Sequence, residues 1–132
     1  MVRTIKSLRS VRAGLFKEID DERARQDQKW GEQNHPDVDP VLMARPRGCP
    51  GARMALELEV PTAPRAKYLT DKSANDGQCC FARIAIEELA EAVEAATQHT
   101  QRELRVELIQ CAAVFVQWIE ALDRREERRS AR

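Results

Sequence analysis

The sequence predicts an all-α protein of about four helices. Apolar residues recur every three or four positions in several segments of more than ten residues, the spacing of one face of a helix. Most glycines and prolines stand between these segments, where they end or separate helices. One stretch, residues 56–60, alternates apolar and charged side chains as a strand does. No second strand is predicted to pair with it, so we assign it to a short helix or turn.

Length and charge limit the classes of protein that this chain can belong to. A chain of 132 residues has room for one modest core, and we predict a single domain over 1–132 with frayed ends at 1–4 and 125–132. Its 42% of hydrophobic and 33% of charged residues are typical of a helix-rich soluble protein. With 22 basic and 22 acidic residues, the molecule as a whole is not an electrostatic nucleic-acid binder.

The chain shows no segment that would place it in or across a membrane. It has no run of about 18 apolar residues, so no transmembrane helix is predicted. Its first residues lack the apolar block of a signal peptide. We therefore expect a cytoplasmic protein with no membrane partner.

The first predicted helix runs from Ile5 to Lys29. Ile5, Leu8, Leu15 and Ile19 keep the helical period, whereas the second half, from Glu18 onward, is almost wholly charged. That half is expected either to be solvated or to line the mouth of a pocket. Glycine commonly ends a helix, so we place the end at Trp30 and Gly31.

A long irregular loop is expected around residues 36–53. This stretch holds four of the six prolines of the chain and two of its five glycines. After it, Thr62 can cap a helix that runs from Ala63 to Asn75, since a proline such as Pro64 is tolerated in a first helical turn.

The most informative segment is a predicted helix from Ile84 to Ala96. On a helical wheel Glu88 lies roughly 60° from the middle of its apolar stripe, and Glu91 lies about 60° further round. Glu87 and Glu94 belong to the same helix. Acids that flank an apolar face are poorly placed for simple solvation. The stripe consists of Phe81, Ala85, Leu89, Ala92 and Ala96.

A second helix, from Glu103 to Asp123, carries a matching arrangement. Glu103, Glu107 and Gln110 share one flank of its apolar stripe, which consists of Leu104, Leu108, Cys111, Phe115, Trp118 and Leu122. If the two helices pack antiparallel, their acidic flanks can converge. Carboxylates forced together either raise their pKa values or bind a hard cation, and Mg²⁺ or Mn²⁺ is the natural occupant. A single pair of glutamates on a helix usually lies exposed on the surface and binds nothing. Two such sets on consecutive helices favour a metal site instead.

These residues resemble the signature of a known family. Glu87-Glu88-Leu89-Ala90-Glu91, followed by Glu107-Leu108-Ile109-Gln110, is similar to the EExxE…ExxD motif of the all-α nucleoside triphosphate pyrophosphohydrolases of the MazG-like group. The run 22–36 also looks like a segment of MazG-like proteins of actinobacteria and their phages. The resemblance covers most of 18–36 and 62–124. It departs from the family at Gln110, where an Asp is usual.

The resemblance implies a four-helix-bundle-like protomer that cleaves an NTP or dNTP to the monophosphate and pyrophosphate with Mg²⁺. Glu88, Glu91 and Glu107 would be metal ligands, with Glu87 supporting them or binding a second ion. Trp30 and His35 would help to form the nucleotide pocket, although either also suits a structural role. The arginines of the loop at 36–53 form either a solvated surface or a lid on the triphosphate. Candidate phosphate-binding cations are Lys67, Arg83, Lys72 and Arg105, each of which also suits a plain surface position.

Three outcomes stay open for Gln110: it ligates the metal as a weaker, neutral ligand, Glu103 takes its place, or the site has lost turnover. The alternative function is therefore a catalytically silent nucleotide- or protein-binding bundle. A DNA-binding role for the arginine-rich tail from Arg124 to Arg132 is a further alternative, whereas no Walker spacing supports a P-loop enzyme. Broad apolar helix faces predict a homodimer or homotetramer.

The four cysteines do not show CxxC spacing. Reduced thiols are the favoured interpretation of Cys49, Cys79, Cys80 and Cys111. The alternative is a zinc site that combines Cys49, Cys79 and Cys80 with a histidine, although adjacent cysteines are awkward joint ligands for this ion.

Overall fold

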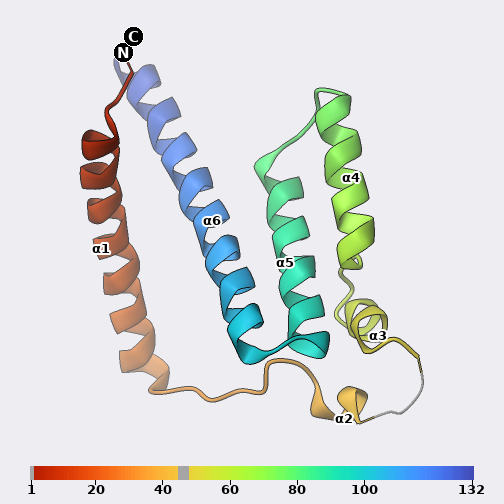
Figure 1. Ribbon diagram of the computed structural model, residues 1–132. Helices are drawn as coiled ribbons and strands as arrows, with labels where there is room; N and C mark the ends of the chain where they lie inside the picture. The colour runs from red at the N-terminus through yellow and green to blue at the C-terminus, as the bar shows by residue number, and fades with distance from the viewer. Residues whose placement is uncertain (1, 45–47) are drawn as a thin grey trace. The chain divides into compact units, whose positions relative to one another are not determined.

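The computed structural model describes residues 2–44 and 48–132, and this part of the chain is helical without strands (Figure 1). The all-α prediction is therefore confirmed. The chain divides into two compact units, residues 1–35 and residues 36–132. The first holds one long helix and the second holds the rest, so a single domain over 1–132 stays a prediction.

The first unit is built on α1, Ile5–Trp30, which agrees with the predicted helix. Thr4 caps its start, because the Thr4 hydroxyl oxygen accepts a hydrogen bond of 3.1 Å from the Ser7 N–H. At its end Gly31 adopts a φ of 67°, which favours glycine, and its N–H donates to the Asp27 carbonyl at 2.7 Å. The charged second half is exposed and carries ion pairs between neighbouring turns, as expected for a solvated segment.

The predicted irregular loop at 36–53 is partly helical, which corrects the prediction. It contains α2, Pro40–Met43, and the start of α3, Pro50–Glu57. Pro40 and Pro50 each stand in a first helical turn, where a missing N–H costs nothing, so these prolines begin helices rather than break them. Arg45 and Arg47 of the predicted basic lid lie outside the described residues.

The second unit continues with α4, Ala63–Asn75, whose bounds agree with the prediction. The Thr62 hydroxyl oxygen accepts from the Arg65 N–H at 3.4 Å and so forms the expected cap. Just after the helix, Gly77 adopts a φ of 70°, where the chain turns toward α5.

The two long helices of the second unit are α5, Phe81–Gln98, and α6, Gln101–Ser130. Thr100 and Glu103 form a reciprocal capping box at the start of α6. The predicted frayed tail at 125–132 is wrong as far as Ser130, because α6 continues to that residue. Arg128 and Arg129 in its last turn favour this extension, since cations stabilise the carboxyl end of a helix.

Helix α5 is the centre of the second unit, since α3, α4 and α6 all pack against it (Figure 1). Small residues on more than one side of α5 are therefore buried: Ala90, Ala92, Val93 and Ala95. The predicted stripe of α5 is correct only in part, because its largest aliphatic member, Leu89, is 46% exposed. A helix contacted from several directions buries more than one narrow stripe.

On α6 the predicted apolar stripe is also only partly buried. Leu104 is buried, and Trp118 stacks on Phe81 of α5 with ring centroids 5.9 Å apart. In contrast, Leu108, Phe115 and Leu122 are 51%, 51% and 49% exposed. Val116 and Ala121, outside the predicted stripe, are buried instead. The periodicity identified an apolar face but not which part of it α5 covers.

The membrane prediction rests on helix length and hydropathy. None of the helices in the described part of the chain is both long enough and apolar enough to cross a bilayer.

Candidate functional site

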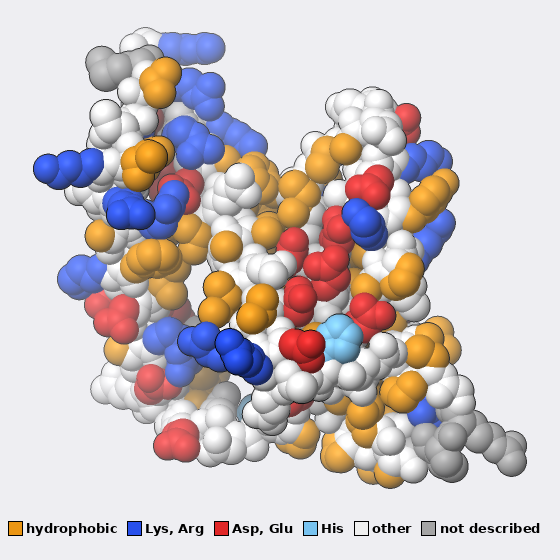
Figure 2. All heavy atoms as spheres, in the orientation of Figure 1, with side chains coloured by type: hydrophobic (Ala, Val, Ile, Leu, Met, Phe, Trp, Pro, Cys, Tyr) orange, Lys and Arg blue, Asp and Glu red, His pale blue; other side chains and the backbone are white. Residues whose placement is uncertain are grey.

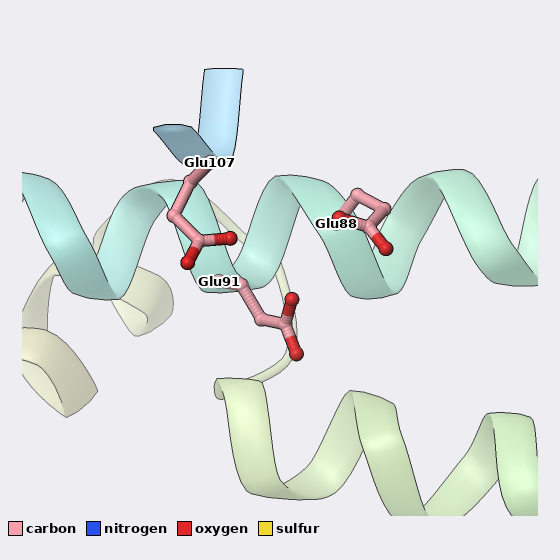
Figure 3. A group of neighbouring side chains, drawn as sticks. All are labelled: Glu88, Glu91 and Glu107. Carbon is pink, nitrogen blue, oxygen red and sulfur yellow. The ribbon is translucent and has the colours of Figure 1, made fainter. Parts of the chain in front are cut away.

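Glu88, Glu91 and Glu107 come together between α5 and α6, as the sequence predicted. Figure 3 shows Glu107 reaching from α6 toward the α5 residues Glu88 and Glu91. One carboxylate oxygen from each of the three lies within 4.8 Å of the others. Acidic side chains gather on the face of the second unit that Figure 2 presents. Spacing of three residues on α5 and the tight turn at 99–100 produce this convergence, because they bring one flank of each helix to the shared interface.

Two carboxylate oxygens of this group are buried without a partner. Glu88 Oε2 and Glu107 Oε2 are shielded from solvent and have no hydrogen-bond donor in the described part of the protein. A buried polar oxygen that lacks a donor costs about 1–3 kcal/mol, and a charged one costs more. The arrangement is therefore unfavourable to the protein alone, and a cation would relieve it.

The electrostatics of the group show the same conflict. Burial, followed by the charges of Glu107 and Glu87, raises the pKa of Glu88. Burial also raises the pKa of Glu91, with the charges of Glu88, Glu107 and Glu87 adding to it, while Lys67 opposes the rise. Glu87 is thus close enough to act on both, as expected of a residue that borders the site.

The candidate phosphate-binding cations lie on two different helices. Lys67 extends from α4, forms an exposed ion pair of 3.4 Å with Asp71, and is near enough to Glu91 to oppose the rise in its pKa that burial and the other glutamates cause. Arg83 is partly buried on α5, one turn before Glu87. Lys67 is thus the predicted cation for which the structure shows an electrostatic link to the acids.

Glu103 is already engaged and is poorly available as a substitute ligand. One of its carboxylate oxygens accepts hydrogen bonds from the Thr100 N–H at 2.8 Å and from the Thr100 hydroxyl at 3.0 Å. These hydrogen bonds lower the pKa of Glu103. Gln110, the residue at the usual Asp position, is exposed on α6. Of the three outcomes left open for Gln110, substitution by Glu103 is therefore disfavoured.

Trp30 and His35 lie together in the first unit. They border a hollow of about 790 Å³ that is also lined by Arg23, Asp27 and Glu32. The ammonium of Lys29 lies 4.6 Å from the centre of a Trp30 ring, and the Trp30 side chain is 55% exposed. An exposed indole beside a hollow is compatible with base stacking, so the role of this pair stays a prediction.

One residue beside the acids was assigned only to the core by its sequence. Cys111, one turn after Glu107 on α6, is half-buried next to the cluster formed by Ala92, Ala95 and Leu104. Burial raises the pKa of its thiol, and the charges of Glu88, Glu107 and Glu91 raise it further. The spacing of four residues from Glu107 was the signal that could have placed it at the site.

The donors fit a hard divalent cation. Three carboxylates and two unpartnered oxygens match the oxygen ligands that Mg²⁺ and Mn²⁺ prefer. Within residues 2–44 and 48–132, three or more acidic, histidine or cysteine side chains come close enough to share an ion only at Glu88, Glu91 and Glu107.

The alternative zinc site is wrong. Cys49 contacts Gln98 at the last residue of α5, whereas Cys79 and Cys80 precede its first residue. A helix of 18 residues is about 27 Å long, so these thiols cannot bind one ion.

Comparison with known proteins adds no relative: no family model, curated protein or solved structure matches the chain. The resemblance to the MazG-like group therefore stays a prediction that depends on the motif residues.

The raised pKa values of Glu88 and Glu91 predict how stability changes with pH. Between the usual value of 4.5 and the raised pKa, the folded state binds more protons than the unfolded state. These two groups therefore stabilise the metal-free fold fully below pH 4.5, and their contribution is lost as the pH rises through the raised pKa.

Glu88→Gln should remove part of the free-energy cost of holding these carboxylates ionised in the folded protein. We expect it to increase the free energy of unfolding of the metal-free protein by less than about 1 kcal/mol at pH 8, because solvent screens a partly exposed carboxylate, with little change at pH 4.5. Urea unfolding in EDTA at both pH values measures the difference. Glu94→Gln, on the same helix but outside the group, is the control. Equal effects of the two substitutions, or a loss of stability in Glu88→Gln at pH 8, would contradict the account.

Proposed function

We propose that the protein is an Mg²⁺-dependent nucleoside triphosphate pyrophosphohydrolase that converts an NTP or dNTP to the monophosphate and pyrophosphate. The observation that carries the proposal is the convergence of Glu88, Glu91 and Glu107, with two buried oxygens that lack donors. A structural role would leave these carboxylates exposed or paired with cations. Such a protein would use the nucleotide pool of the cytoplasm, where we propose that it resides.

Each residue has a distinct part in this proposal. Glu88, Glu91 and Glu107 would hold the metal, and Glu87 adds negative charge beside them. When bound, Mg²⁺ would neutralise the triphosphate and activate a water for attack at the α–β linkage. Lys67, already close to Glu91, would contact a phosphate oxygen at the edge of the site. Trp30, His35 and Arg83 are proposed to contact the nucleotide.

The test is pyrophosphate release across a panel of ribo- and deoxyribonucleoside triphosphates, with Mg²⁺, with Mn²⁺ and with EDTA. We expect turnover with at least one nucleotide and none in EDTA. Nucleotide binding is measured in parallel by equilibrium dialysis. Binding without turnover would support the alternative, a catalytically silent binder, and would overturn the enzyme.

Gln110→Asp should strengthen metal binding. A carboxylate at this position would add a negative charge one turn from Glu107, and changes around a metal typically alter affinity about 10- to 100-fold. We expect the Mg²⁺ concentration for half-maximal turnover to fall by about 10-fold. The matched control is Gln117→Asp, which places the same charge two turns further along the same face of α6. Equal responses of the two variants would show that Gln110 does not face the metal.

We also propose that the protein forms a homodimer or homotetramer through α6. Leu108, Phe115 and Leu122 follow one another at intervals of seven residues, and each is about half exposed. Interacting helices commonly show this interval, and a lone monomer seldom exposes such a row. Sedimentation equilibrium should give a mass of at least twice 15.1 kDa. A monomer at micromolar concentration would refute this assembly.

A further inference from the structure

Helix α6 runs well past the helix that it packs against. It has 30 residues, whereas α5 has 18, so α6 is about 18 Å longer. Phe81, the first residue of α5, stacks on Trp118, and the turns of α6 that follow continue beyond the start of α5 (Figure 1). Every residue of α6 after Ala121 is exposed to solvent. The last turns of α6 are therefore open to a partner.

The charges of these last turns are separated by sign around the helix. Basic and acidic residues are mixed along the sequence, but each residue turns an α-helix by about 100°. The four arginines of these turns fall within an arc of about 140°, and the three acids fall within a separate arc of about 100°. This arginine face consists of Arg124, Arg125, Arg128 and Arg129, and the acidic side consists of Asp123, Glu126 and Glu127.

The positive charge of the arginine face is not neutralised by the described part of the chain. All four side chains are exposed, and none of them forms an ion pair with a carboxylate in residues 2–44 and 48–132. The Arg128 Nε–H donates a hydrogen bond of 3.3 Å to the Arg124 carbonyl, which leaves the other N–H groups of Arg128 for an external acceptor. Because salt screens charges over about 8 Å, this local group of cations acts on a partner even though the chain has no net charge.

An aromatic hollow adjoins the arginine face. It has a volume of about 450 Å³, and its lining includes Phe81, Ile84, Trp118 and Arg125. The rings of Phe81 and Trp118 are nearly parallel, with planes inclined by 14° and centroids 5.9 Å apart. Arg125 belongs to both features, and Trp118 lies on the same side of α6 because seven residues make about two helical turns. Stacked rings and guanidinium groups are thus presented along one side of α6.

We propose that the arginine face and the aromatic hollow together bind single-stranded nucleic acid. Arginines about one helical turn apart contact successive phosphates of the strand, and an unpaired base stacks against the rings of the hollow. Sequence-tolerant binding of single strands commonly combines a cationic surface with aromatic rings in this way. The proposal uses neither the acidic group nor the proposed nucleotide contacts.

The aromatic hollow favours a single strand over a duplex. Phosphates alone would satisfy the arginine face in either form, because the phosphate backbone supplies most of the non-specific affinity. In a duplex, however, each base is stacked between its neighbours, whereas the bases of a single strand are able to stack on protein rings. The environment of Trp118 therefore distinguishes the two classes of partner.

The test is a fluorescence-anisotropy titration of a labelled oligothymidylate with the full chain. EDTA is present throughout and the oligonucleotide carries no triphosphate, so the result is independent of the proposed hydrolase activity. In a Trp30→Phe background Trp118 is the sole tryptophan, and we expect its emission to be quenched in parallel with the rise in anisotropy. A duplex of the same length should leave the Trp118 emission unchanged.

Arg125→Gln/Arg129→Gln removes two proposed phosphate contacts. Each contact with a single strand contributes about −0.7 to the slope of log K against log salt, so this slope should become less negative by about 1.4. Affinity in about 0.1 M salt should fall at least about 10-fold.

Trp118→Leu keeps an apolar contact with Phe81 but removes the indole ring. It should weaken binding of the single strand by at least about 5-fold, because a stacked base is lost. The salt slope should stay at the parent value, since stacking releases no counterions.

The matched control is Arg102→Gln/Arg105→Gln, which removes the same charge from exposed positions near the other end of α6. It should bind the strand within about 2-fold of the parent, because those positions lie beyond the screening distance. Circular dichroism verifies that each variant is folded. The proposal is overturned if about 100 μM protein does not bind the strand in about 50 mM salt. It is also overturned if the control loses as much affinity as Arg125→Gln/Arg129→Gln, or if Trp118 emission fails to respond to the strand or responds equally to the duplex.

Discussion

Glu91→Ala is expected to lower pyrophosphate release by at least about 100-fold at saturating Mg²⁺. Even residues that only support metal ligands typically change affinity or activity by about 10- to 100-fold, and Glu91 is proposed to bind the metal directly. Burial and the neighbouring glutamates raise the pKa of Glu91 and Lys67 opposes the rise, so Glu91 is also the acid on which this proposed phosphate contact acts. A 100-fold loss corresponds to about 2.7 kcal/mol of transition-state stabilisation.

The control for Glu91→Ala is Glu94→Ala. Glu94 lies about one turn further along α5 and borders a different cavity, next to Cys49 and Gln98. Its removal should therefore change turnover less than about 3-fold. Initial rates at several Mg²⁺ concentrations distinguish loss of metal affinity from loss of turnover. Wild-type rates in Glu91→Ala would remove the acidic group from the mechanism, whatever activity the protein has.

Met54→Ala is expected to destabilise the second unit by about 3 kcal/mol, since truncating a buried methionine usually costs about 2–5 kcal/mol. Met54 is 1% exposed and is the largest fully buried side chain in the described residues. It lies on α3, which packs against α5, so its loss would leave a void beside the helix that carries Glu88 and Glu91. Because small proteins are only marginally stable, this substitution would remove much of the total free energy of unfolding.

Urea unfolding followed by circular dichroism measures the effect of Met54→Ala. Leu56→Ala on the same helix is the control, because Leu56 is 76% exposed and should change the free energy of unfolding by less than about 0.5 kcal/mol. Similar losses in the two variants would show that Met54 is not the residue that fixes α3 on α5.

The helix ends were predictable because their signals are local. Thr62 and Gly31 act within a few residues of their own positions, and both do what their residue types indicate. Pro40 and Pro50 show what local sequence signals cannot decide. A proline is compatible with both a loop and a first helical turn, and only the following residues decide between them.

The acidic group was predictable in position but not in environment. Helical spacing placed Glu88, Glu91 and Glu107 on flanks that can meet, and the structure brings them within 4.8 Å. No sequence pattern could show that Glu103 is held by Thr100, or that two carboxylate oxygens are buried without donors. Those facts depend on which atoms of neighbouring helices occupy the intervening space.

By itself, the sequence determined that the chain is helical, where its main helices lie, and that three glutamates flank adjoining faces. Periodicity and capping determine these features because they operate over one or two turns. Only the tertiary structure decided that Met54 is buried while Leu108, Phe115 and Leu122 stay half exposed. Burial depends on the partner that each side chain meets, and α5, with three helices around it, shields its neighbours more completely than α6 does.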